Sequence, residues 1–437
     1  MSPEILGLVA LAILFVAIFI GFPIAFTLIA LALGVGQFAL GDVAIHLMTL
    51  QVFSVMRDPT LASVPFFLFM GYLLEESGLI QRLFRGVQLL LAPVNGSLYL
   101  AVIITATIFA AATGIVGSSV TLLGVMAAPA MMKSGYNVRM SAGSITAGGT
   151  LGILIPPSVM LIVMGPVVGV PATDLFAAAI FPGLLLSGLF ILYTLARSYW
   201  NPQLGPALPM SDRRPMPEVL RELVIGAVPV VLVILATLGV ILAGIATPTD
   251  AGAVGAFATF LLTLAYRRMT WPGLRRSMMS TVEVSCMILL LVAASNYFGS
   301  IFSRLGSADF IANLLLGLEF PPTVMLLLML LLIFILGWPL EWVPIVLVVV
   351  PIFLPIVNKL GIDLLWFCTL VAVCLQTAWM SPPVALSAYF LKGVVPQWDL
   401  KDIYLGMMQF MALQLIGLLL ILWFPAIALW LPGVLRQ

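Results

Sequence analysis

The run GIVGSSVTLLGVMAAPA (114–130) places glycine and hydroxyl residues at the middle of a long apolar stretch, 96–133, and this interruption is the most informative feature for the fold. A second apolar stretch, 321–358, is interrupted in the same way by GWPLE (337–341). A membrane-spanning helix needs about 20 apolar residues, and free backbone polar groups at bilayer depth survive only inside protein or beside a hydrated cavity. Neither stretch therefore divides into ordinary spans.

The composition indicates a chain whose solvent is lipid. Of 437 residues, 63% are hydrophobic and 8% are charged, whereas a soluble domain carries about 25% charged residues. The 18 Lys and Arg against 17 Asp and Glu leave no basic surface for nucleic acid. One His and three Cys without a CxxC spacing exclude most metal and thiol chemistry. The chain has no phosphate-binding loop and no catalytic constellation, so we expect neither an enzyme nor an ATP-driven pump.

The remaining apolar stretches predict ten full crossings. The first, 5–40, divides into two spans at 21–23, and the others fall near 59–77, 137–155, 175–196, 223–245, 248–266, 279–301, 362–380 and 403–431. If 96–133 and 321–358 turn back as re-entrant hairpins, the basic residues left outside are only Arg57, Arg304, Lys359 and Arg436. Most Lys and Arg residues then lie on the cytoplasmic side, which fits the positive-inside rule and puts both termini outside.

An internal repeat relates the two halves of the chain. A shift of 226 residues places Pro129 on Pro355, Gly135 on Gly361, and the Pro156–Pro157 pair on Pro382–Pro383. We expect a first repeat over 1–198, a cytoplasmic linker over 199–222, and a linking span with the second repeat over 223–437. An odd number of crossings separates equivalent points of the two repeats, so the repeats are inverted in the membrane. Paired Gly/Pro breaks in inverted halves mark a transporter's binding site. The alternative is an old duplication in which the prolines are only kinks.

The breaks predict two cradles that face each other across a cavity. Each hairpin tip, 114–119 and 337–341, is expected to face a broken span, 147–158 and 376–383. Unwound carbonyls and hydroxyls suit Na⁺, and a half-helix N-terminus suits an anionic substrate. Small residues at these places are also explained by close helix packing alone. Glu341 is costly at this depth unless it meets a cation, substrate or structural partner.

Four runs, 114–137, 147–158, 247–255 and 380–394, resemble the large membrane subunit of tripartite ATP-independent periplasmic (TRAP) transporters, the DctM family. The resemblance implies an all-α polytopic membrane protein of elevator type, with about ten transmembrane helices and two re-entrant hairpins in inverted repeats. It implies Na⁺-coupled import of a small organic acid across the bacterial inner membrane, without an organic cofactor. The implied partners are a small DctQ-like membrane subunit and a periplasmic DctP-like binding protein.

The same resemblance carries site residues onto this chain. The implied sodium ligands are Gly117, Ser118, Ser119, Gly149, Gly152 and Pro156 in the first cradle, and Gly337, Gln376, Thr377 and Met380 in the second. The implied substrate contacts are Ser119, Thr121, Pro156, Glu341 and Pro382. The chain departs from the family pattern in 338–342 and at Ser381. A self-sufficient sodium/carboxylate carrier of the same superfamily and a channel-like scaffold subunit stay open as alternatives.

Overall fold

The computed structural model describes residues 2–114, 116–209, 213–338, 340–382 and 385–436, and every regular element in these ranges is a helix. The helices of the first half are α1 (Pro3–Ile20), α2 (Ile24–Leu40), α3 (Val43–Arg57), α4 (Ser63–Glu76), α5 (Leu79–Leu90), α6 (Ser97–Thr113), α7 (Val116–Lys133), α8 (Val138–Leu154), α9 (Val159–Val168) and α10 (Ala172–Trp200). A short 3₁₀ turn, η1 (Pro202–Leu204), follows.

The second half continues the same pattern. Its helices are α11 (Met216–Ile234), which runs through a π-helical turn into α12 (Val240–Leu242), α13 (Pro248–Ala265), α14 (Trp271–Arg304), α15 (Ser307–Leu316), α16 (Pro322–Leu336), α17 (Trp342–Pro344), α18 (Val350–Lys359), α19 (Leu364–Ala378), α20 (Leu386–Val394), α21 (Leu400–Trp423) and α22 (Ala426–Leu435). Among the described residues, nine helices are long and apolar enough to cross a membrane, or ten if the bent pair α4–α5 is one span. The expectation of an all-α polytopic membrane protein is confirmed.

Glycine and proline end the helices where the sequence places them. The first apolar stretch breaks at Gly21, whose φ of 102° suits glycine, and α2 begins directly after Pro23. Between α8 and α9 stands the Pro156–Pro157 pair, which cannot continue a helix. The expected last span, 403–431, is divided, because α21 ends at Trp423 and Pro425 precedes α22.

Helix boundaries follow the 226-residue shift. The composite helix Trp342–Lys359, which combines α17, a π-helical turn and α18, begins and ends 226 residues after α7 (Val116–Lys133). Likewise α19 begins 226 residues after α8. The order of helix, tip, helix and broken helix is thus the same in both halves.

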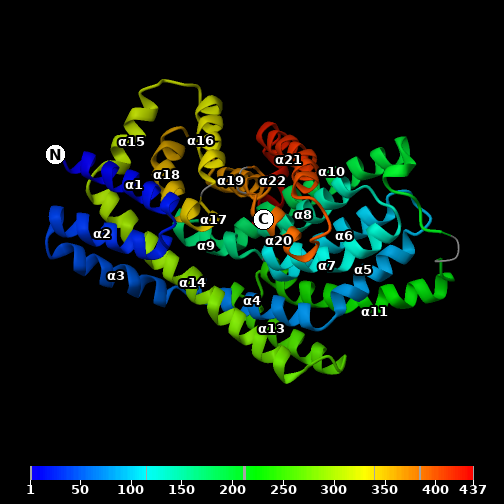
Figure 1. Ribbon diagram of the computed structural model, residues 1–437. Helices are drawn as coiled ribbons and strands as arrows, with labels where there is room; N and C mark the ends of the chain where they lie inside the picture. Colours follow the sequence, from blue (N-terminus) through cyan, green and yellow to red (C-terminus); the bar gives the residue numbers. More distant parts are fainter. Residues whose placement is uncertain (1, 115, 210–212, 339, 383–384, 437) are drawn as a thin grey trace.

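Two groups of helices lie side by side. Figure 1 shows α14 as one long helix that runs past α2 and α3 toward α4, and these three helices all contact it. Beside this group, α8 packs against α6, α7, α19 and α21. Every residue of α8 from Met140 to Leu154 is buried. We call α1–α4 and α11–α14 the outer group, and α6–α10 with α16–α21 the inner group.

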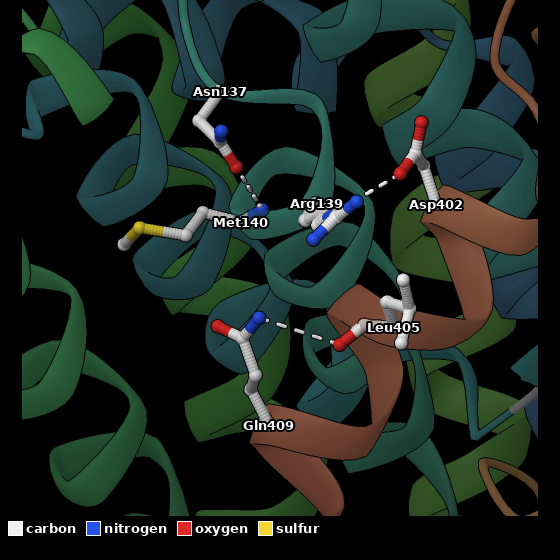
Figure 2. A network of polar contacts seen from close by, with 6 residues as sticks. All are labelled: Asn137, Arg139, Met140, Asp402, Leu405 and Gln409. Atoms are coloured by element: carbon white, nitrogen blue, oxygen red, sulfur yellow. Dashed lines mark hydrogen bonds and ion pairs between the residues drawn. The ribbon is translucent and has the colours of Figure 1, made fainter.

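The crossing of α8 and α21 is tight at the backbone. A Cβ on Gly406 would stand 2.0 Å from the carbonyl oxygen of Arg139. Figure 2 shows the polar contacts that frame this crossing: the Asn137 side chain accepts a hydrogen bond from the Met140 amide (3.1 Å), and Arg139 pairs with Asp402 (2.8 Å). Two turns further along α21, the crossing brings Gln414 into contact with α8.

Candidate functional site

A cavity of about 190 Å³ lies between the two hairpin tips. Its lining includes Gly117 from the first tip, Glu341 and Trp342 from the second, Val159 and Met160 from the start of α9, and Trp379 from the end of α19. Both tips and both helix breaks therefore border one space. The sequence predicts a cavity at this place, whereas the binding of ions by the tips and breaks stays a prediction.

The first tip lies directly on the first helix break. Gly114 has a φ of 64°, and a Cβ there would stand 3.0 Å from the carbonyl oxygen of Pro157. On the neighbouring turns, a Cβ on Gly149 would meet the Val120 side chain at 2.3 Å and the Val120 amide nitrogen at 3.0 Å. Close packing thus requires glycine at both Gly114 and Gly149, independently of any bound ion.

The hydroxyl of Ser118 joins the first tip to the outer group. It donates a hydrogen bond of 2.5 Å to a carboxylate oxygen of Glu75, at the end of α4. The sequence does not predict this contact, because the apolar pattern of 59–77 gives no sign that its last turn meets a hairpin. Of the other residues that the resemblance implies here, Ser119 and the substrate contact Thr121 are in α7, Gly152 is buried in α8, and Pro156 is buried after α8.

The second tip contacts the end of α19. A Cβ on Gly337 would stand 2.6 Å from the Cβ of Ala378, so here too the tip needs glycine. Another cavity of about 190 Å³ lies beside this contact and is bordered by Glu341 and Trp379. These two residues also border the central cavity. Of the proline positions named from the sequence, Pro339 and Pro383 lie outside the described residues, whereas Pro382 is described and exposed.

Glu341 is exposed to the cavities and makes no hydrogen bond or ion pair with any described residue. No Lys or Arg stands among the described residues that line either cavity. Lys359, at the end of the same hairpin, donates a hydrogen bond to Asn313 (3.3 Å) instead. A structural ion pair therefore does not account for this carboxylate.

A buried polar junction holds the two halves together. Both Gln376 and Gln414 donate a hydrogen bond of 3.2 Å from Nε2 to the Thr150 hydroxyl. That hydroxyl donates to the Ala147 carbonyl (2.8 Å) and lies 3.8 Å from the sulfur of Met380. The amide oxygens of Gln376 and Gln414 are buried without a partner in the described part of the chain. The sequence pointed to Gln376 and Met380 but missed Gln414.

The chain has helical spans, and its two hairpin tips lie against two helix breaks around a shared cavity. These features define the class of protein as a polytopic membrane permease. The model of the DctM component of the tripartite ATP-independent periplasmic transporters matches residues 11–427. The chain belongs to this family. It is thus a transporter's large permease subunit rather than an enzyme, and an integral protein of the inner membrane.

Relatives align along nearly the whole chain. The C4-dicarboxylate TRAP transporter large permease protein DctM of Rhodobacter capsulatus is 28% identical and covers 98% of this chain and 99% of its own. The sialic acid large permease SiaM of Vibrio cholerae is also 28% identical, covering 95% and 96%. The isethionate permease DctMQ of Oleidesulfovibrio alaskensis is 29% identical, covering 99% of this chain and 70% of its own.

Solved structures share the fold. The Alcanivorax borkumensis YdaH transporter superposes with a TM-score of 0.64 at 16% identity, covering 97% of this chain and 98% of its own. At this identity the likeness concerns the fold alone. It agrees with the helical architecture described above.

Proposed function

We propose that this chain is the large membrane subunit of a Na⁺-coupled, binding-protein-dependent secondary transporter that imports a small organic acid by an elevator movement. The observation that carries the proposal is the central cavity, which both hairpin tips and both helix breaks border. Irregular backbone at bilayer depth is tolerated where it lines such a cavity. Within an elevator, the inner group moves as a body and the outer group stays fixed.

Na⁺ is the proposed coupling ion. In the first cradle, Ser118, Ser119 and the break at 154–158 offer hydroxyl and carbonyl oxygens, which are hard ligands. In the second, the ligands come from Gly337, Gln376, Thr377 and Met380. The substrate contacts the cavity side of the same elements, at Ser119, Thr121, Pro156, Glu341 and Pro382.

The proposed assembly has three parts. A small DctQ-like membrane subunit packs beside this chain, and a periplasmic DctP-like protein delivers the acid. The relative in which permease and small subunit carry the joint name DctMQ supports the first partnership. The names of the C4-dicarboxylate and sialic acid permeases support an organic acid as substrate. Two inverted repeats, 1–198 and 223–437, with both termini periplasmic, complete the proposal.

Uptake into proteoliposomes tests this function. The purified large and small subunits should accumulate acid only with the binding protein present and an inward Na⁺ gradient. Ser119→Ala should raise the Na⁺ concentration for half-maximal uptake. Accumulation without the binding protein would favour a self-sufficient carrier, and non-saturating flux without a gradient would favour a channel-like subunit.

A further inference from the structure

The walls of the central cavity are almost wholly apolar. Of the 15 described residues that line it, 12 carry apolar or aromatic side chains, two are glycines and one is Glu341. The only other polar side-chain groups among these residues are the indole N–H groups of Trp342 and Trp379. No Lys, Arg, His, Ser, Thr, Asn or Gln borders the cavity in the described part of the chain. The side chains there therefore offer few hydrogen bonds and no ion pair to an acid inside the cavity.

Both groups of helices supply these apolar walls. Met287 lies on α14 of the outer group, whereas Met160 on α9 and Phe390 on α20 belong to the inner group. Trp379, directly after α19, stacks with Phe390, and their ring centroids are 6.3 Å apart. The cavity has a volume of about 190 Å³, and an apolar cavity of about 150 Å³ holds a benzene ring. A single ring, or a branched chain of similar size, therefore fits between these walls.

A hydroxyl or carboxylate that enters this cavity loses its hydration without gaining a side-chain partner, which costs free energy, and a carboxylate is also repelled by Glu341. A monocarboxylate can enter with its apolar body first and keep its charge at the border, whereas a dicarboxylate carries a charge at each end. We infer that the transported acid is a monocarboxylate with an aromatic or aliphatic body, and that Trp379 and Phe390 bind this body. This inference rests on the proposed function and narrows its substrate class.

Acids of matched chain length test the polarity of the cavity. Hexanoate, adipate and gluconate share a six-carbon chain, to which adipate adds a second carboxylate and gluconate adds hydroxyls, and phenylacetate carries a ring. Met287→Cys, in a Cys286→Ser background, places one thiol on the cavity wall, since Cys368 and Cys374 are buried. Protection of this thiol from methyl methanethiosulfonate is measured on the purified large and small subunits. The control is Met278→Cys, exposed on the same helix outside the cavity lining.

We expect hexanoate and phenylacetate to protect the thiol at position 287 at concentrations about tenfold or more below those of adipate and gluconate. None of the four acids should protect the control thiol. Trp379→Leu, which removes the ring but keeps an apolar wall, should weaken protection by phenylacetate more than by hexanoate. In the unsubstituted protein, hexanoate and phenylacetate should raise the thermal midpoint more than the other two acids, so the result does not depend on how the variants fold.

Three outcomes would overturn the inference. The first is protection by adipate or gluconate at concentrations equal to or below those of the apolar acids. The second is a thermal midpoint that neither hexanoate nor phenylacetate raises, together with an unprotected thiol at position 287. The third is equal weakening of both apolar acids by Trp379→Leu, which would remove the role of the ring. Labelling and unfolding need no transport, so failure of Na⁺-driven uptake, which tests the proposed function, is seen separately.

Discussion

At Thr150 a single hydroxyl accepts hydrogen bonds from two buried amides, those of Gln376 and Gln414. Thr150→Val keeps the shape of the side chain and removes the acceptor, which leaves both amide donors buried and unpaired. Each such donor costs about 1–3 kcal/mol. We expect a loss of about 2 kcal/mol or more in the free energy of unfolding, seen as a lower thermal midpoint in detergent.

The control for this change is Thr146→Val, one turn earlier on α8. The Thr146 hydroxyl is equally buried but donates only to backbone carbonyls of its own helix. Removing the Thr146 hydroxyl leaves no buried donor without an acceptor, so the thermal midpoint of unfolding should stay near that of the wild type. Equal destabilisation by the two variants would show that Gln376 and Gln414 gain little from Thr150.

Glu75 places a negative charge beside a proposed sodium ligand. Glu75→Gln can still accept the hydrogen bond from Ser118 but removes the charge. If Ser118 binds Na⁺, the lost attraction should raise the Na⁺ concentration for half-maximal uptake by about tenfold, which corresponds to about 1.4 kcal/mol. Initial uptake rates at varied Na⁺ measure this.

The neighbouring Glu76 provides a matched control for Glu75. It pairs with Arg276 at 3.0 Å on the surface, with the Arg276 side chain 69% exposed. Such exposed pairs contribute about 0–1 kcal/mol, so Glu76→Gln should leave the Na⁺ dependence unchanged. An unaltered Na⁺ dependence in Glu75→Gln would remove Ser118 from the sodium site.

Sequence reasoning reaches individual residues only where a local pattern marks them. Gly117, Ser118 and Ser119 stand out because small and hydroxyl residues interrupt an apolar run. Gln414 does not, because one glutamine in an apolar helix has no local signature and its partner Thr150 lies 264 residues away. The contact between Glu75 and Ser118 was missed for the same reason.

At the scale of helices, α7 and α8 approach so closely that Gly149 leaves no room for a methyl group. Gly149→Ala would place a Cβ 3.0 Å from the Val120 amide nitrogen and nearer still to its side chain. Overpacking of this kind typically costs about 1–3 kcal/mol. The variant should lower the thermal midpoint and slow uptake per folded molecule, because the first tip must move off the break.

A glycine with open space separates this packing effect from helix propensity. Gly188 lies within α10, and a Cβ there would meet nothing within 4 Å. Gly188→Ala should keep or raise the midpoint, since alanine is the better helix former. If Gly149→Ala behaves like Gly188→Ala, the tip and α8 are not in firm contact.

Helix ends are predictable where proline or glycine forces them. The breaks at 21–23 and at Pro156–Pro157 lie where the sequence places them. The division of 403–431 was missed, because an apolar window measures only hydropathy and gives little weight to Pro425. The 61° bend between α4 and α5 likewise depends on Gly78, which has a φ of 70°.

For the whole molecule, the repeat was the most informative signal, since α7 and Trp342–Lys359 obey the 226-residue shift at both ends. Membrane class and family followed from composition and motifs. The contacts between the inner and outer groups could not be predicted from the sequence, because that interface is made of side chains from distant helices. Glu75 on α4 and Ser118 on α7 are one such pair.

If the inner group moves as a body against the outer group, a cross-link between Glu75 and Ser118 must stop transport. The pair Glu75→Cys and Ser118→Cys, joined by a one-carbon bis-methanethiosulfonate, would tie α4 to the first tip. We expect uptake to fall to background after cross-linking and to return when a reductant cleaves the link. Uptake is measured in proteoliposomes, and the linked fraction by mass spectrometry.

The control cross-link lies wholly within the inner group. Thr107 on α6 and Ser187 on α10 have hydroxyl oxygens 2.7 Å apart, so Thr107→Cys with Ser187→Cys can be joined by the same reagent. In an elevator these two helices travel together, and this link should leave most of the uptake intact. The two links thereby distinguish a rigid moving body from local gating. Full uptake by a completely linked 75–118 pair, or equal inhibition by both links, would contradict movement between the two groups.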